Sequence, residues 1–224
     1  MTKIISIVVV LVLIVVLVKS FNKPETAKVV STDTASSTPI KIEGDAKYSI
    51  NNSTSVVNWT GRKVVLKNWI DKGVISVKEG TMEFKDGKLV SNSFVFDMTS
   101  IKASSTGAGG GQDKLTTHLK SADFFDVEKY ATSSFVAKDF TDSISASSTV
   151  DIKGDLTIKG VTKEVVIPTV FHQNADGSIH ALGSVDIDRT LWDIRYGSGK
   201  FFKGLGDNVI DDMFNISFDI NFVK

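Results

Sequence analysis

Apolar and polar side chains alternate with a period of two residues from about residue 48 to residue 224, and few folds accommodate that pattern. The alternation is clearest near the end of the chain, where the apolar residues are Phe214, Ile216, Phe218, Ile220 and Phe222. Successive side chains of a β-strand point to opposite faces, so the pattern predicts strands with one buried and one solvated face. The same period recurs at 94–98, 150–158 and 184–188.

Turn sequences such as Asp86-Gly87, Lys159-Gly160 and Asp176-Gly177 divide this region into strands. We expect strands at about 48–60, 62–70, 73–85, 88–98, 133–140, 150–159, 163–171 and 180–188, with 212–223 as a ninth candidate. The first two are expected to reduce to a single bent strand. One helix is predicted, at Gln112–Lys120, because Leu115 and Leu119 are spaced four residues apart.

Strands with one apolar face and no helices to cover them fit either a β-sandwich or a closed barrel. Periodicity does not choose between the two architectures. The expected inward side chains include many phenylalanines, which are a common way to fill a core. A small barrel either fills its interior with such side chains or keeps a cavity for one ligand. Both kinds of interior therefore stay open at this point.

Residues 1–21 form a separate segment. Residues 4–18 are apolar except for Ser6, and Lys3 and Lys19 flank them. At 1.5 Å per residue this run spans about 22 Å, short of a ~30 Å hydrocarbon core unless the flanking residues extend it. A cleaved signal peptide is the alternative, but no pair of small residues in the usual cleavage pattern follows the run. We expect an uncleaved signal-anchor helix at 1–21.

The region at 22–46 is rich in Ser and Thr and has no apolar period, so it predicts a linker to a folded domain at 47–224. The domain would then lie at the periplasmic or extracellular side of a membrane. The chain has 26 basic and 26 acidic residues, which argues against nucleic acid as a partner. It has no cysteine, which excludes disulfides, cysteine nucleophiles and cysteine-ligated metals. The sequence sets no oligomeric state.

Four spaced motifs occur between residues 46 and 224. They are Tyr48-Ser49-Ile50, HLKSADFFDVEKY at 118–130, GDLTIKGVTK at 154–163 and DRTLWDIRYGSG at 188–199. Together they resemble the signature of the YceI-like family of polyisoprenoid-binding proteins. The resemblance implies an all-β fold, a closed eight-stranded antiparallel lipocalin-like barrel with one short helix, in an exported protein. It also implies an apolar tunnel that takes an isoprenoid or a similar long-chain amphiphile.

The resemblance and the alternation together predict which side chains line the tunnel. The expected wall consists of the inward apolar residues Val57, Trp59, Phe94, Phe96, Met98, Phe135, Leu156, Ile158, Phe214, Ile216, Phe218 and Ile220. The predicted ligand is a polyisoprenoid or an isoprenoid quinone, and no cofactor, metal or catalytic residue is predicted. Arg189, Arg195 and Lys200 could form a cationic rim for a phosphate head group. Alternatively, these cations pair with Asp188 and Asp193 and lock a turn.

Two other functions stay open. A ligand-free β-sandwich or filled barrel would be an envelope interaction module instead of a lipid carrier. An enzyme would be favoured if His118, in the predicted helix, lay close to a carboxylate at a cavity wall. His172 and His180 flank the Asp176-Gly177 turn and could approach each other, although a metal site usually needs a third ligand.

Overall fold

The computed structural model describes residue 40 and residues 42–140 and 149–224. Within these ranges the chain forms nine strands: β1 (Ala46–Ile50), β2 (Val56–Arg62), β3 (Ile70–Lys85), β4 (Lys88–Ser105), β5 (Thr132–Asp139), β6 (Thr149–Ile158), β7 (Val161–Gln173), β8 (Ile179–Asp188) and β9 (Met213–Val223). The α-helix is α2 (Gln112–Lys120), and η1 (Arg189–Trp192) and η2 (Gly206–Asn208) are single 3-10 turns. The predicted anchor helix at 1–21 lies outside the described residues. Among the described residues, no helix is long and apolar enough to cross a membrane.

The strands form one antiparallel sheet that closes on itself. β1 and β2 occupy the same position in this sheet, because both of them pair with β3 on one side and with β9 on the other. Trp59, for example, lies opposite Gly73 of β3 and Ile216 of β9. Nine strands therefore fill eight positions of a closed barrel, which confirms the predicted barrel and eliminates the sandwich.

Two sequence predictions at the start of the barrel were wrong in detail. The expected strand at 48–60 is interrupted at residues 51–55, because the Asn51 carboxamide oxygen accepts hydrogen bonds from the backbone and side chain of Ser53 and closes a turn. The expected strand at 62–70 does not form. Residues 64–69 instead make the β2–β3 loop, since the apolar residues Val64, Val65 and Leu66 are consecutive and do not alternate.

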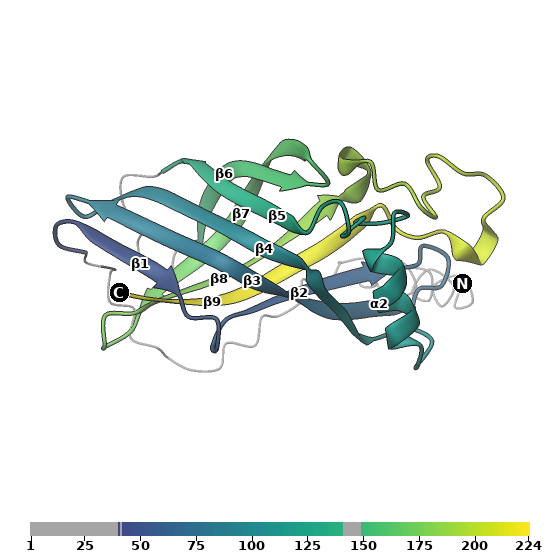
Figure 1. Cartoon of the computed structure of the whole chain (residues 1–224), viewed down its shortest axis with the longest axis horizontal. Coiled ribbons are helices and arrows are strands. Elements are labelled where there is room, and N and C mark those ends of the chain that lie inside the picture. Colours follow the sequence, from purple (N-terminus) through teal and green to yellow (C-terminus); the bar gives the residue numbers. More distant parts are fainter. Residues whose placement is uncertain (1–39, 41, 141–148) are drawn as a thin grey trace, which may run out of the picture. The chain divides into compact units, whose positions relative to one another are not determined.

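The antiparallel order places the connections alternately at the two ends of the barrel (Figure 1). One end carries the β2–β3 loop, α2, the β6–β7 turn and the segment at 189–212. The opposite end carries the β3–β4 and β7–β8 hairpins. We call the first of these the α2 end, and it is where the functional groups described below gather.

Helix α2 has the predicted bounds and packs as an end cap on the barrel. Leu119 and Phe124 are buried in the core, and Leu115 and Phe125 are half-buried against it. The helix begins after Gly111, whose φ of 82° is in the left-handed region that glycine adopts without strain. The helix predicted from the spacing of Leu115 and Leu119 is confirmed, and both leucines face the core.

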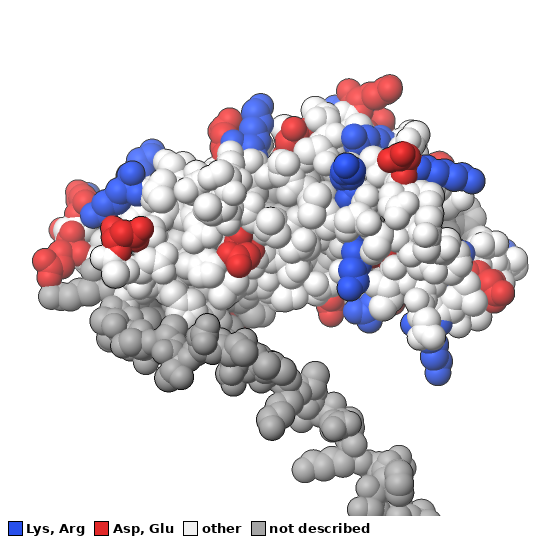
Figure 2. Space-filling model, turned by 90° about the horizontal axis from the view of Figure 1, so that it is seen from below, with Lys and Arg blue, Asp and Glu red and all other residues white. Residues whose placement is uncertain are grey.

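The outer surface carries side chains of both signs, and Figure 2 shows Lys and Arg together with Asp and Glu on one face. Some of these charges pair across neighbouring strands, as Lys47 does with Glu83 at 2.6 Å and Lys138 with Asp155 at 2.7 Å. Exposed pairs of this kind contribute only about 0–1 kcal/mol each. The barrel is therefore held mainly by its interior and its backbone ladder.

Candidate functional site

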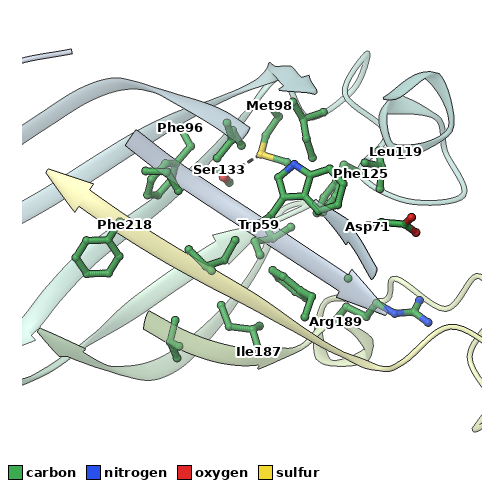
Figure 3. A pocket seen from close by; sticks show the side chains of 18 of the residues that line it. Trp59, Asp71, Phe96, Met98, Leu119, Phe125, Ser133, Ile187, Arg189 and Phe218 are labelled. Atoms are coloured by element: carbon green, nitrogen blue, oxygen red, sulfur yellow. Dashed lines mark hydrogen bonds between the residues drawn. The ribbon is translucent and has the colours of Figure 1, made fainter. Parts of the chain in front are cut away.

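The barrel encloses a cavity of about 580 Å³ with a largely apolar wall (Figure 3). Sites for drug-sized ligands have volumes of roughly 300–1,000 Å³ and are mostly apolar with a few polar groups. The interior is therefore not filled by its own side chains, and the filled-barrel alternative does not describe this chain.

The structure places every residue of the predicted wall on the cavity: Val57, Trp59, Phe94, Phe96, Met98, Phe135, Leu156, Ile158, Phe214, Ile216, Phe218 and Ile220. That these residues contact a lipid stays a prediction. Sequence reasoning missed the contribution of β7, where Ile167, Thr169 and Phe171 also line the cavity. Their alternation was obscured because Val166 and Val170, on the other face of the same strand, are apolar too.

The cavity stays open because its aromatic rings lie over glycines of neighbouring strands. The directly paired residues are Trp59 with Gly73, Phe94 with Gly80, and Phe218 with Gly183. A Cβ atom on any of these glycines would overlap the ring that lies over it. A glycine in a strand often marks such a close approach. The rings therefore follow the wall of the barrel and leave its centre free.

The mouth of the cavity is at the α2 end. The exposed members of the lining all lie there, and they are Arg62, Ala108, Gly110, Gly111 and Lys114. The small residues belong to the loop before α2. A ligand can therefore enter between this loop, α2 and the β2–β3 loop.

His118 lies at this mouth and is close to a carboxylate. Its Nε2 atom is 3.1 Å from Oδ2 of Asp123, and its ring makes edge contacts with Phe124 and Tyr196, with centroid separations of 4.9 and 4.5 Å. This is the approach that sequence analysis singled out as favouring an enzyme. In the described part of the chain, however, no hydroxyl hydrogen-bonds to the imidazole. The imidazole packs against Phe124 and Tyr196 as part of the cap.

The other two histidines lie outside the cavity wall. His172 and His180 face each other across β7 and β8, with ring centroids 6.4 Å apart, and Nε2 of His180 bonds to Asp219 of β9. Among the described residues, no three His, Cys, Asp or Glu side chains are arranged to hold a metal ion.

Arg189 is buried and fully engaged with backbone. Its guanidinium donates hydrogen bonds to the carbonyl oxygens of Ile194 at 2.9 Å, Tyr196 at 2.8 Å and Asp211 at 3.0 Å. Burial lowers the pKa of Arg189, and the charge of Asp212 at 3.6 Å opposes that effect. The side chain thus ties the segment after β8 to the start of β9.

The other two predicted rim cations pair with neighbouring carboxylates. Nε of Arg195 lies 2.5 Å from Oδ1 of Asp193, and Nζ of Lys200 lies 2.8 Å from Oδ2 of Asp188. Neither Arg195 nor Lys200 belongs to the cavity lining. The structure therefore does not bring the three predicted cations together at the cavity, and their pairing follows the alternative in which they lock a turn.

Two buried polar atoms on the cavity wall have no hydrogen-bond partner within the described ranges. They are the indole nitrogen of Trp59 and the carboxamide oxygen of Asn92. Figure 3 shows the indole nitrogen directed toward Met98 and Phe125, inside the barrel near its mouth. An unpaired buried donor costs about 1–3 kcal/mol, so a ligand with an acceptor here would recover that free energy. Sequence analysis treated Trp59 only as apolar wall and did not select Asn92.

Comparison with known proteins gives one family. The profile of the YceI-like domain matches residues 48–222. A UPF0312 protein of Vibrio cholerae is 31% identical over 100 residues, which are 45% of this chain and 49% of that protein. A UPF0312 protein of Ectopseudomonas mendocina is 35% identical over 99 residues, 41% of this chain and 48% of that protein. The alignments thus span about half the length of the curated relatives.

Two solved structures have a similar fold. BcnA of Burkholderia cenocepacia is 20% identical, with a TM-score of 0.56 over 77% of this chain and 98% of that chain. A polyisoprenoid binding domain from Saccharophagus degradans, implicated in plant cell wall breakdown, is 13% identical, with a TM-score of 0.57 over 78% of this chain and 97% of that chain. At these identities the likeness establishes the fold alone.

Proposed function

The chain belongs to the YceI-like domain family, and from that premise we propose that its barrel binds a polyisoprenoid or an isoprenoid quinone for transport or storage. The observation that carries the proposal is the apolar cavity of about 580 Å³ that opens at the α2 end. The similar fold of the polyisoprenoid binding domain from Saccharophagus degradans supports the same class of ligand. The proposal involves no covalent chemistry.

The energetics favour exchange with a membrane over extraction into water. Burial of each CH₂ group is worth about 0.8 kcal/mol relative to water. Relative to a bilayer this gain nearly vanishes, because lipid tails are as apolar as the cavity wall. A barrel of this kind would therefore load and unload close to equilibrium with a membrane. The apolar segment at 1–21 and the linker at 22–46 support a domain tethered at the outer side of that membrane.

The indole N–H of Trp59, which is unpaired among the described residues, favours an uncharged head group beside it. Charged side chains line the cavity at the α2 end. Figure 3 shows Asp71 and Arg189 there. Arg62 ends β2, and Lys114 belongs to α2. Deeper in the barrel an ionised phosphate would be buried without a counter-ion, which is strongly unfavourable. The free N–H of Trp59 instead suits a neutral oxygen such as a quinone carbonyl. We therefore favour a prenyl lipid with an uncharged oxygen near Trp59.

Lipid extraction tests the proposed function. Full-length protein is purified from membranes, extracted with organic solvent and analysed by mass spectrometry, and the expected result is a co-purified prenyl lipid. Phe96→Trp fills the cavity without adding charge and should lower the amount of lipid or shift it to shorter chains. The matched control is Val136→Trp, which adds the same ring at an exposed position on β5. Two results would contradict the proposal. One is an equal amount of co-purified lipid in the two variants. The other is a parent protein that carries no lipid and does not bind added prenyl alcohols.

A further inference from the structure

Two loops lie side by side at the mouth of the cavity. The backbone N–H of Val64, in the β2–β3 loop, donates to the carbonyl oxygen of Val209 at 3.0 Å. Lys63 forms a β-bridge with Ile210, and its Nζ atom is 3.5 Å from Oδ1 of Asn208. Ile210 and Trp69 also line the cavity. The β2–β3 loop therefore contacts residues 208–210, and this loop and the segment at 196–209 both belong to the surface of the α2 end beside the opening.

This surface exposes large apolar side chains from both loops. Val64 and Val65 are 54% and 52% exposed, and Phe201 and Phe202 are 44% and 48% exposed. Single exposed apolar residues are ordinary on a protein surface and need no explanation. A group of them on adjacent loops at the mouth of an apolar cavity is different, because such groups mark interaction sites. We call Val64, Val65, Phe201 and Phe202 the mouth patch.

Basic residues surround the mouth patch, although the whole chain is electrically balanced. The stretches at 62–70 and 195–209 contain one acidic residue, Asp207, and six cations, which are Arg62, Lys63, Lys67, Arg195, Lys200 and Lys203. Lys67 and Lys203 make no ion pair with any other residue that the structure describes. Each apolar tip is thus bracketed by lysines, at 63 and 67 in one loop and at 200 and 203 in the other.

We propose that the mouth patch docks on a membrane surface that contains anionic lipids. Apolar tips flanked by lysines suit the boundary between head groups and acyl chains, where the amines meet lipid phosphates. A second copy of the chain is a poorer occupant, because two identical basic surfaces would repel each other. Docking places the cavity mouth at the head-group layer. The proposed function supplies the purpose of this contact, which is passage of the lipid without exposure to water, but the contact itself needs no ligand.

The absence of cysteine makes this docking directly measurable in the full-length protein. Phe202→Cys introduces a single thiol, which is labelled with a fluorophore whose emission depends on polarity. The matched control is Val90→Cys, because Val90 is 47% exposed on β4 near the opposite end of the barrel. Both proteins are reconstituted in vesicles of phosphatidylcholine, with or without phosphatidylglycerol. The label at 202 should shift to the blue and be quenched by nitroxide lipids in the anionic vesicles, and the label at 90 should not.

Charge removal tests the electrostatic part of the proposal. Lys67→Gln and Lys203→Gln are combined with the label at 202, and the control combines Lys47→Gln with Lys138→Gln on the barrel wall. Each lysine near an anionic surface contributes about a fivefold factor, so the docked-to-free ratio should fall roughly 25-fold in the patch variant. Added salt should weaken docking in the parent in the same direction.

Three results would overturn the inference. The first is equal emission from the labels at 202 and 90 in anionic vesicles, which would show that tethering alone explains membrane association. The second is a shift at 202 that is independent of phosphatidylglycerol and of both lysines. The third is a shift that grows with protein concentration in the absence of vesicles, which would identify a second copy as the occupant. None of these results depends on the lipid content of the cavity, which the extraction experiment measures separately.

Discussion

Replacing Gly80 by alanine would place a methyl group beneath the ring of Phe94. An ideal Cβ atom at this position would lie 2.9 and 3.1 Å from Cδ1 and Cε1 of Phe94 and 3.2 Å from Cβ of Ile50. None of these atoms belongs to the backbone, so the substitution can be accommodated if the ring moves. Phe94 contacts Phe96 and Phe222, with centroid separations of 6.1 and 5.8 Å, and the movement would therefore be toward the cavity.

The expected loss of stability is modest. Overpacking in a closely packed site typically costs about 1–3 kcal/mol, and replacing a glycine in a strand recovers about 0.5–1 kcal/mol. The net loss should be about 0.5–2 kcal/mol, which corresponds to a decrease in Tm of roughly 1–8 °C for a domain of this size. The narrowed cavity should also shift binding toward shorter prenyl chains.

Gly73→Ala provides the contrast. Its Cβ atom would overlap the carbonyl oxygen of Lys102, which is backbone of β4 and cannot move without disturbing the ladder between β3 and β4. The cost should exceed about 3 kcal/mol, beyond the usual range of overpacking. Thermal unfolding followed by near-UV circular dichroism gives the loss of stability for Gly80→Ala and for Gly73→Ala. Phe94→Leu serves as the matched background, in which Gly80→Ala should become neutral or stabilising.

The reasoning would be refuted by either of two results. One is a Tm for Gly73→Ala that equals that of Gly80→Ala, because backbone overlap and ring overlap would then be indistinguishable. The other is an unchanged cost of Gly80→Ala in the Phe94→Leu background. That result would mean that the ring over Gly80 does not determine the shape of the cavity wall.

Three further substitutions test the cap, the head group and the turn after β8. Phe124→Ala should destabilise the protein by about 3–5 kcal/mol in denaturant unfolding, because its ring is buried and contacts His118 of α2. An unchanged midpoint would show that the segment is a free loop. Trp59→Phe keeps a ring over Gly73 but removes the N–H. Affinity for a prenyl quinone should therefore fall about fivefold, because one hydrogen bond contributes roughly 1 kcal/mol. Affinity for a prenyl hydrocarbon of equal length should not change. Burial alone would raise the pKa of Asp188, but hydrogen bonds from Lys200 and Thr190 hold it below its ordinary value. The contribution of the ionised Asp188 carboxylate to folding stability is therefore present at neutral pH and is lost as the pH falls below about 4. Lys200→Gln should lower the free energy of unfolding at pH 7 by about 0.2–1 kcal/mol, since this lysine is about half exposed. The difference from the parent should vanish in acid. A difference that persists in acid would contradict this assignment.

Local patterns in the amino-acid sequence were sufficient to predict most strands, the bounds of α2 and the inward face of each strand considered. The reason is that the period of two is a property of the strand itself. Burial of one face places apolar residues at every second position of the sequence. Phe214, Phe218 and Leu156 could therefore be assigned to the interior without knowledge of their neighbours. The anchor at 1–21 and the linker at 22–46 stay predictions of the same local kind, outside the described residues.

Only the tertiary structure decided what lies opposite each of these faces. Closure depends on pairings between distant segments, such as Ser49 with Val223, and periodicity carries no information about partners. The run at 64–66 forms a loop, because its apolar residues are consecutive and do not alternate between an inward and an outward face. Whether phenylalanines fill an interior or line a cavity depends on what lies beneath each ring, and beneath Phe94, Phe135 and Phe218 it is a glycine on an adjacent strand. For the same reason Arg189, predicted at a head-group rim, is instead buried among backbone carbonyls that its own sequence neighbourhood does not reveal.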